Sequence, residues 1–272
     1  MNIILALIVA IMGAVVYYEP VLWLTNSWLQ HSYYKHGFFI LAISIGMIVF
    51  KVLRSKTVTG RNYIWIVYLL ISTVLYTSGV LLGSNYLTTL PIFFTLLAIA
   101  YILGEYVNVS KLTFPVLLPI IAIPLPFILE ITSSLQIIIV YLSTGILSSI
   151  GFDIHSVGAE IVLPNARFVV GEPSSGIQSL IALVTLMVLA IYFTKTSLTR
   201  KIVLCFLTVP AAIFGNLMRV LVFLVVGYRY GQETAYNFWH NTANVIFFVF
   251  SLLLLLLLWY FVGAKKKLGY RR

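Results

Sequence analysis

Three polar stretches interrupt an otherwise apolar chain, and each contains a side chain that can take part in catalysis. The segment 170–180, "VGEPSSGIQSL", places two hydroxyls side by side at Ser174 and Ser175. Arg219 stands in the apolar run "AAIFGNLMRVLVFLVVG", and His240 stands in "NFWHNTANVIFF". A nucleophile, a cation that holds developing oxyanion charge and an imidazole that carries a proton are the components of acyl transfer. The few Asp and Glu residues show no metal-ligand spacing, so neither a metal nor a cofactor is expected.

Each of these residues also has a plainer interpretation. Ser174 or Ser175 can simply be the N-cap of the helix that follows. Arg219 can extend its side chain to the membrane interface, and His240 can be an isolated interfacial residue. Asn216 favours a site in the interior of the helix bundle, because residues three apart share one helix face and form a polar stripe with Arg219.

The composition identifies an integral membrane protein. Of the 272 residues 61% are hydrophobic and 9% charged, and apolar runs of spanning length recur along the chain. We predict an all-α fold in one polytopic domain, residues 1–272, with about eight transmembrane helices. They are expected at Ile3–Tyr18, Phe38–Leu53, Tyr63–Leu82, Leu87–Gly104, Leu112–Leu129, Ile177–Phe193, Ile202–Val226 and Asn241–Val262. Prolines in the fifth segment predict a bent or early-ending helix. Cys205, the only cysteine, is expected to be a small packing residue.

Positive charges set the predicted orientation. Lys and Arg concentrate at 51–61, 195–201 and 265–272, which we expect on the cytoplasmic side together with both termini. This clustering of the net charge of +10 favours a membrane protein over a nucleic-acid-binding one. The segment Glu130–Gly176 then lies outside. Its first part, "ITSSLQIIIVYLSTGILSSIG", is expected to be an interfacial or re-entrant helix, because a crossing would move 195–201 outside. The following "FDIHSVGAEIVLPNARFVV" predicts a short extracellular hairpin.

The sequence resembles the exosortase/archaeosortase family of membrane transpeptidases. The resemblance rests on "GEPSSGIQSL", "GNLMRVLVF", "FWHNTANVIFF", the early "YYKHGFFI" and the Pro-rich "IPLPFILEITSSLQ", which occur in the family's order. In the family, the nucleophile motif runs Glu-X-Cys-Ser-Gly, a second motif has Asn and Arg three apart, and a third begins with His. The resemblance implies that Ser174 occupies the position of the nucleophilic Cys, and that Arg219 and His240 complete the catalytic set.

The same motifs imply supporting or substrate-binding roles for five further residues. These are Glu172, Ser175, Gly176, Asn216 and His36.

Serine at position 174 departs from the family pattern. A serine hydroxyl is far less acidic than a thiol, whose reference pKa is about 8.5, and an adjacent guanidinium cannot remove its proton. Because the rest of the catalytic set is intact, we interpret the chain as an engineered Cys-to-Ser form with impaired catalysis. A natural variant with altered or lost activity is the alternative.

The resemblance also implies a reaction and its partners. Family members resemble sortases in logic and act on secreted proteins that carry a C-terminal signal of a short motif, a transmembrane helix and a basic end. They cut near the motif on the outer face of the cytoplasmic membrane of a prokaryote. The acyl group then passes to a lipid or glycan acceptor. The expected partners are these substrates, the acceptor and membrane lipids, and no nucleic acid.

Two other functions remain open from the residues alone. A rhomboid-like intramembrane serine protease would pair Ser175 with His240, although Pro173 stands where that family has Gly and Arg219 has no role in such a dyad. A transporter or lipid-binding protein would line a path with Asn216 and Arg219. Against it, the paired broken helices of many transporters are not evident.

The predicted orientation has a direct test. Single cysteines at Asn165 and Ser197, in a Cys205→Ala background, are treated in intact cells with a membrane-impermeant thiol reagent. Labelling is expected at position 165, which we place outside, and not at position 197, which lies in a basic cytoplasmic loop. The reverse pattern would overturn the orientation.

Overall fold

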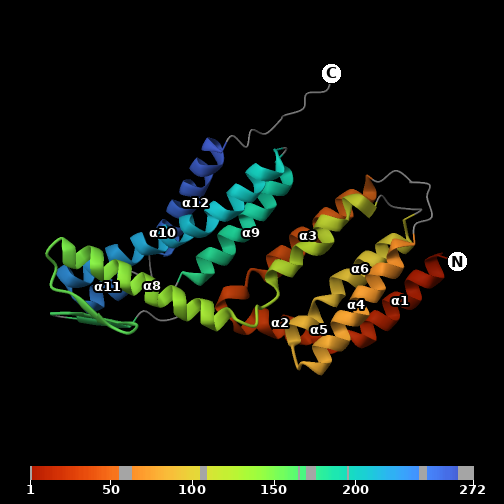
Figure 1. Ribbon diagram of the computed structural model, residues 1–272, viewed down its shortest axis with the longest axis horizontal. Helices are drawn as coiled ribbons and strands as arrows, with labels where there is room; N and C mark the ends of the chain where they lie inside the picture. Colours follow the sequence, from red (N-terminus) through yellow and green to blue (C-terminus); the bar gives the residue numbers. More distant parts are fainter. Residues whose placement is uncertain are drawn as a thin grey trace, which may run out of the picture. The chain divides into compact units, whose positions relative to one another are not determined.

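The structure is a computed structural model that describes residues 2–54, 63–104, 109–164, 166–169, 176–194, 196–238 and 244–262. Its contacts divide the chain into two compact units, Met1–Pro126 and Phe127–Arg272, and each is described by itself (Figure 1). The expectation of a single domain stays a prediction.

The N-terminal unit is a set of helices of very different lengths. They are α1 (Asn2–Val16), α2 (Tyr18–Gln30), η1 (Ser32–Tyr34), α3 (Gly37–Leu53), α4 (Ile64–Leu81), α5 (Asn85–Thr89), α6 (Pro91–Ile102), η2 (Val109–Lys111), α7 (Thr113–Leu117) and η3 (Leu118–Ala122). α4 packs against α5 and α6, α6 against α1, and α3 against α7 and η3. α4 and α5 approach each other closely at Gly79 of α4, where an added Cβ would lie 2.7 Å from the backbone nitrogen of Thr88 in α5.

A bend of 60° separates α1 from α2. At the bend the Tyr17 hydroxyl lies 2.7 Å from the Ser72 hydroxyl and 2.9 Å from that of Thr95, and these two are 2.7 Å apart. Three hydroxyls thus bond one another in apolar surroundings, where an unbonded one would be costly, and they attach the bend to α4 and α6. The sequence prediction ends its first helix at Tyr18 and misses α2, because polar residues such as Glu19 and Asn26 break the apolar run.

An aromatic cluster joins the early motif "YYKHGFFI" to the Pro-rich segment. The Trp28 indole donates to the Ala122 carbonyl at 2.8 Å, and the Leu125 amide donates to the Tyr34 hydroxyl at 3.0 Å. Both rings are buried. The helical stretch that begins at Thr113 ends at Ala122, so the prediction of an early-ending fifth helix is confirmed.

The C-terminal unit is built on one long helix. Its elements are α8 (Ile128–Ser149), β1 (His155–Val157), β2 (Glu160–Leu163), β3 (Ala166–Val169), α9 (Ile177–Phe193), α10 (Leu198–Tyr230), α11 (Gln232–Phe238) and α12 (Asn244–Phe261). α9 and α12 both pack on α10, and the three helices lie side by side in Figure 1. α8 packs instead on α10, β1 and β2. The four other helices that the structure describes in this unit, α8, α9, α11 and α12, therefore all contact α10.

The predicted hairpin is a three-stranded antiparallel sheet in the order β1-β2-β3. Alternate side chains point inward, among them Ile161 and Leu163 of β2 and Phe168 of β3. Phe168 lies over Gly227 of α10, where an added Cβ would meet its ring at 2.6 Å. The sheet is therefore seated directly on the α10 backbone.

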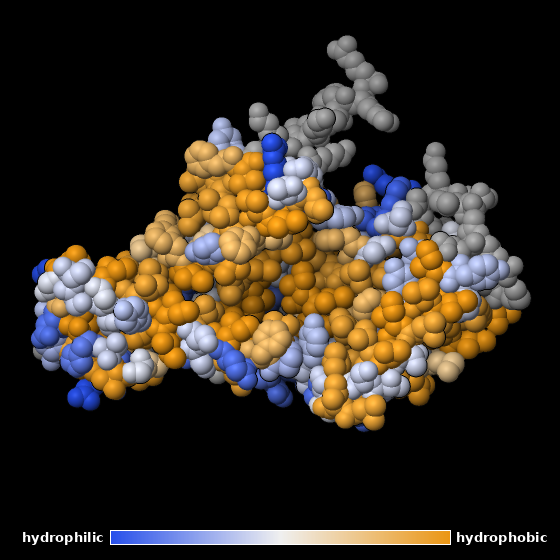
Figure 2. Space-filling view, viewed as in Figure 1, coloured by the Kyte–Doolittle hydropathy of each residue, from blue (hydrophilic) through white to orange (hydrophobic). Residues whose placement is uncertain are grey.

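The helices agree with the all-α membrane protein predicted from the sequence. Among the residues that the structure describes, α4, α5 with α6, α8 and α10 are long and apolar enough to cross a membrane, and α1 with α2 adds a fifth candidate. Apolar side chains cover much of the visible surface of both units (Figure 2). α3 and α9 are shorter apolar helices at predicted positions, so a total of about eight spans stays a prediction. The interfacial placement of α8, which is an unbroken helix of 22 residues, also stays a prediction.

The Trp28 bond yields a stability prediction. Trp28→Phe should lower the free energy of unfolding by about 1–3 kcal/mol, because the Ala122 carbonyl is left buried without its donor. Trp259→Phe is the control, since the buried Trp259 indole nitrogen has no hydrogen-bond partner among the described residues. Thermal unfolding in detergent measures both. Equal losses in the two variants would show that the hydrogen bond contributes nothing.

Candidate functional site

The candidate site lies where α10 passes from one apolar core to another. The first core joins α9, α10 and α12 and includes Leu204 and Ala212. The second joins α8, the sheet, α10 and α11 and includes Leu217 and Leu224. The polar stripe predicted from the sequence occupies the stretch of α10 where these cores meet.

Asn216 and Arg219 form one buried pair at this junction. The Arg219 guanidinium donates to the Asn216 side-chain oxygen at 2.5 Å. Their side chains are only 4% and 6% exposed. Arg219 is thus enclosed by protein, which favours a place inside the helix packing over extension to the membrane interface. The predicted stripe is confirmed, and it holds a fixed positive charge inside the helix packing.

Gly176 brings the start of α9 against this pair. It caps α9 in a left-handed conformation with φ +82°, and an added Cβ would lie 2.4 Å from the Asn216 side chain. Only glycine meets both requirements without strain. The last residue of "GEPSSG" and the first of "NLMR" are therefore in direct contact, although they are far apart in the sequence.

A second glycine sets the position of α12. A Cβ at Gly215 would lie 2.9 Å from the Ser251 Cβ and nearer still to its hydroxyl oxygen, which donates to the Phe247 carbonyl. Sequence reasoning missed this contact. The sequence does contain an indication of this contact, because Ser251 is a lone polar residue within the run "VFSLLLLLLLW".

Several predicted site residues fall outside the described residues. These are Glu172, Ser174, Ser175 and His240. Of the described ones, Gly176, Asn216 and Arg219 come together. Cys205 does not pack in the interior as expected: it is exposed, because it is turned away from the buried side that carries its neighbour Leu204.

His36 belongs to the N-terminal unit and lies just before α3. Its ring stacks on Tyr34, and its Nε2 atom is buried with no hydrogen-bond partner in the described part of the chain. Burial lowers the pKa of His36, and a hydrogen bond to the Tyr33 backbone opposes this only in part. The neutral imidazole is therefore the favoured form.

Fold and site together define a helical membrane protein that holds an enclosed Asn–Arg pair beside a glycine-capped helix start. The sequence matches the transmembrane exosortase family (Exosortase_EpsH) over residues 28–257. The chain therefore belongs to this family, which supports a membrane transpeptidase-type function in general. Neither the curated proteins nor the solved structures give a significant match.

The Gly215 contact predicts a rescue. Gly215→Ala should lower the free energy of unfolding by about 1–3 kcal/mol through overpacking against Ser251. Adding Ser251→Gly removes the clashing atoms. The Cβ of Ala at position 215 then lies 3.5 Å from the Cα at position 251, which is an ordinary contact. Thermal unfolding should therefore show recovery in the double variant. Gly145→Ala, on open helix surface, is the control and should not destabilise. A double variant no better than Gly215→Ala would refute the contact.

His36 predicts a dependence of stability on pH. Its pKa is lowered in the folded protein, so unfolded chains bind the proton more readily. The stabilising contribution is complete above about pH 6.5 and is lost as the pH falls below it. Unfolding midpoints at several pH values should show that His36→Gln loses less stability on acidification than the parent chain. Parallel curves would contradict the assignment.

Proposed function

We propose that this chain is the scaffold of a cysteine-type membrane transpeptidase, with serine at the nucleophile position. The reaction is cleavage near the C-terminal sorting signal of a secreted protein and transfer of the acyl group to a surface lipid or glycan. Ser174 marks the nucleophile, Arg219 stabilises charge and His240 carries the proton.

The contact between Gly176 and Asn216 is the observation that carries this proposal. Ser174 precedes Gly176 by two residues, and two residues of extended chain reach at most about 7 Å. The proposal therefore assigns Ser174 a place within this distance of Gly176, which itself contacts Asn216. Gly176, and not a serine, is the N-cap of α9, so the alternative in which Ser174 or Ser175 simply caps this helix is wrong.

Arg219 is suited to hold an oxyanion. Attack on a peptide carbonyl places negative charge on its oxygen, and a fixed guanidinium in a water-poor site stabilises that charge strongly. Asn216 holds the side chain through its oxygen acceptor. The guanidinium is therefore oriented before substrate arrives.

The packing of α12 supports the role of His240. α12 begins at Asn244, about 10 Å along the helix from Ser251, and runs antiparallel to α10 (Figure 1). Arg219 on α10 and the start of α12 therefore lie on the same side of the Gly215–Ser251 contact, measured along the helix axes. His240 precedes Asn244 by four residues, which reach at most about 14 Å.

Serine should support binding but little turnover. Cysteine and serine are similar in size, so recognition of the substrate helix is preserved. A thiolate attacks without a base, whereas a serine must lose its proton during attack. Arg219 accepts no proton, and a site built around a thiolate need not hold His240 within reach of Ser174.

The proposal places the enzyme in the cytoplasmic membrane of a prokaryote, with both termini inside and the site on the outer face. The basic segments support this orientation. The substrate's own transmembrane helix would bring its motif to the outer boundary of the membrane. Glu172, Ser175 and His36 are assigned supporting roles.

Restoring the thiol is the test. With a co-expressed substrate bearing the C-terminal signal, Ser174→Cys should produce a size shift that the parent chain shows weakly or not at all. Adding Arg219→Ala or Arg219→Lys should reduce processing at least about a hundredfold. Adding His240→Ala should do the same, since no other proton carrier is assigned.

Matched variants distinguish the alternatives. Arg229→Ala removes an exposed cation of the same helix and should leave processing unchanged. A rhomboid-like protease would instead be active as it stands and lose activity in Ser175→Ala. Full processing by the parent chain or by Ser174→Ala would show that Ser174 is not the nucleophile position.

A further inference from the structure

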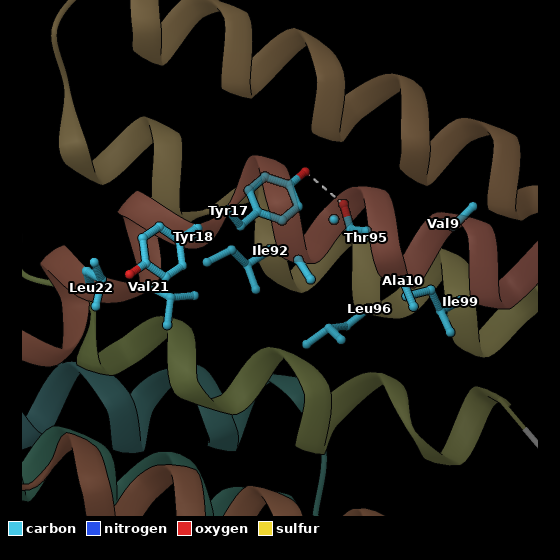
Figure 3. A pocket seen from close by; sticks show the side chains of 12 residues that line it. Val9, Ala10, Tyr17, Tyr18, Val21, Leu22, Ile92, Thr95, Leu96 and Ile99 are labelled. Atoms are coloured by element: carbon cyan, nitrogen blue, oxygen red, sulfur yellow. Dashed lines mark hydrogen bonds between the residues drawn. The ribbon is translucent and has the colours of Figure 1, made fainter.

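An apolar groove in the N-terminal unit takes no part in the proposed chemistry. It has a volume of about 410 Å³ and runs along α1, the bend, α2 and α6 (Figure 3). Its lining side chains are aliphatic apart from Tyr17, Tyr18 and Thr95. The hydroxyls of Tyr17 and Thr95 already bond each other and Ser72. Of the lining residues, only Tyr18 thus offers a hydroxyl that is not bonded in this way.

The groove continues an exposed apolar surface of the chain. Tyr18 and Leu22 of α2 and Leu96 of α6 line it and are 64%, 45% and 45% exposed. On α1 it is bordered by exposed apolar residues such as Ile11 and Val15. In a membrane protein such a surface meets hydrocarbon rather than water. The material that fills the groove must therefore be apolar.

The dimensions favour a single hydrocarbon chain over a helix. The lining runs from Val9 to Leu22 on α1 and α2, about 20 Å, and from Ile92 to Ile99 on α6, about 10 Å. The volume therefore corresponds to a mean cross-section of about 20–40 Å². A helix is about 10 Å wide, or about 80 Å², and would remain mostly outside.

The two ends of the groove differ in polarity. At the α1 end it is lined by Val9 and Ala10 together with Ile99 (Figure 3). At the α2 end it is lined by Val21 and Leu22, with the exposed Tyr18 beside them and Glu19 next to Tyr18 in the sequence. Tyrosine prefers the level of lipid headgroups. A lipid would accordingly place its headgroup at Tyr18 and its chain along α1 toward Val9.

We propose that this groove binds one acyl chain of a membrane lipid, with the headgroup at the α2 end. The bend at Tyr17 shapes the site, because the three bonded hydroxyls hold α1 and α2 against α4 and α6. The inference is independent of the proposed catalytic activity.

Photocrosslinking tests the proposal on the full chain in phosphatidylcholine–phosphatidylglycerol vesicles. The probe is a phosphatidylcholine with a diazirine near the end of one acyl chain. Adducts should concentrate on α1 and α6 near Val9 and Ile99. Ala14→Phe, which fills the groove, should reduce labelling of the α6 peptide at least about tenfold, since displaced methylenes lose their burial.

Val15→Phe is the matched control, since it adds the same ring to the neighbouring, outward-facing position. It should leave labelling unchanged. Ala10→Phe serves as a second filling variant if Ala14→Phe does not fold. Equal labelling in the filled and control variants would overturn the proposal. So would displacement of the lipid adduct by a crosslinked apolar transmembrane peptide, because the groove would then dock a helix.

Discussion

The need to enclose a guanidinium governs the C-terminal unit. An arginine in an apolar helix is unfavourable by about 2.5 kcal/mol or more at the centre of a membrane, unless protein groups replace its water. Here Asn216 bonds Arg219 from the preceding turn, and neighbouring elements exclude lipid from both. The rest of the unit is arranged around this pair: α9 starts on it, and two apolar cores close it from either side along α10.

Close backbone approach, rather than bulky apolar contact, fixes the helices at this point. Lipid is as apolar as leucine, so burying more leucine gives little preference for one helix register over another. Gly176 and Gly215 supply the preference instead, because each fits one partner side chain and no larger residue would fit there. They act at neighbouring positions of α10, because Gly176 lies against Asn216 and Gly215 lies against Ser251. A small change at either position should therefore move a whole helix.

Hydropathy alone located most helices well. The predicted Ile177–Phe193 is α9 to the residue, and Phe38–Leu53 and Tyr63–Leu82 match α3 and α4 within one residue at each end. Long apolar runs leave the chain no alternative to a helix in lipid. The prediction missed α2, whose polar residues hide it, and placed the start of α10 too late. These errors arise where polar or charged residues, such as Arg200 and Lys201 in the first turn of α10, interrupt the hydropathy signal.

The candidate site was only partly predictable. A spacing of three on one helix is local information, so the Asn216–Arg219 pair follows from the sequence. The contacts of Gly176 and Ser251 depend on which helices become neighbours, and no spacing within one segment encodes that. The resemblance to a family supplied the connection between motifs that physical reasoning on separate helices could not make.

The length of α10 makes the protein responsive to the thickness of its bilayer. Its 33 residues extend about 50 Å, so even a tilt of about 40° cannot hide it within about 30 Å of hydrocarbon. Arg219 lies about 32 Å from the helix start, close to one hydrocarbon thickness. In longer-chain lipids the hydrocarbon boundary moves along α10, and the protein must change its tilt or the membrane must thin locally, while the surrounding protein keeps lipid away from the charge of Arg219. The lipid composition of the surrounding membrane thereby affects the same helix that carries Arg219.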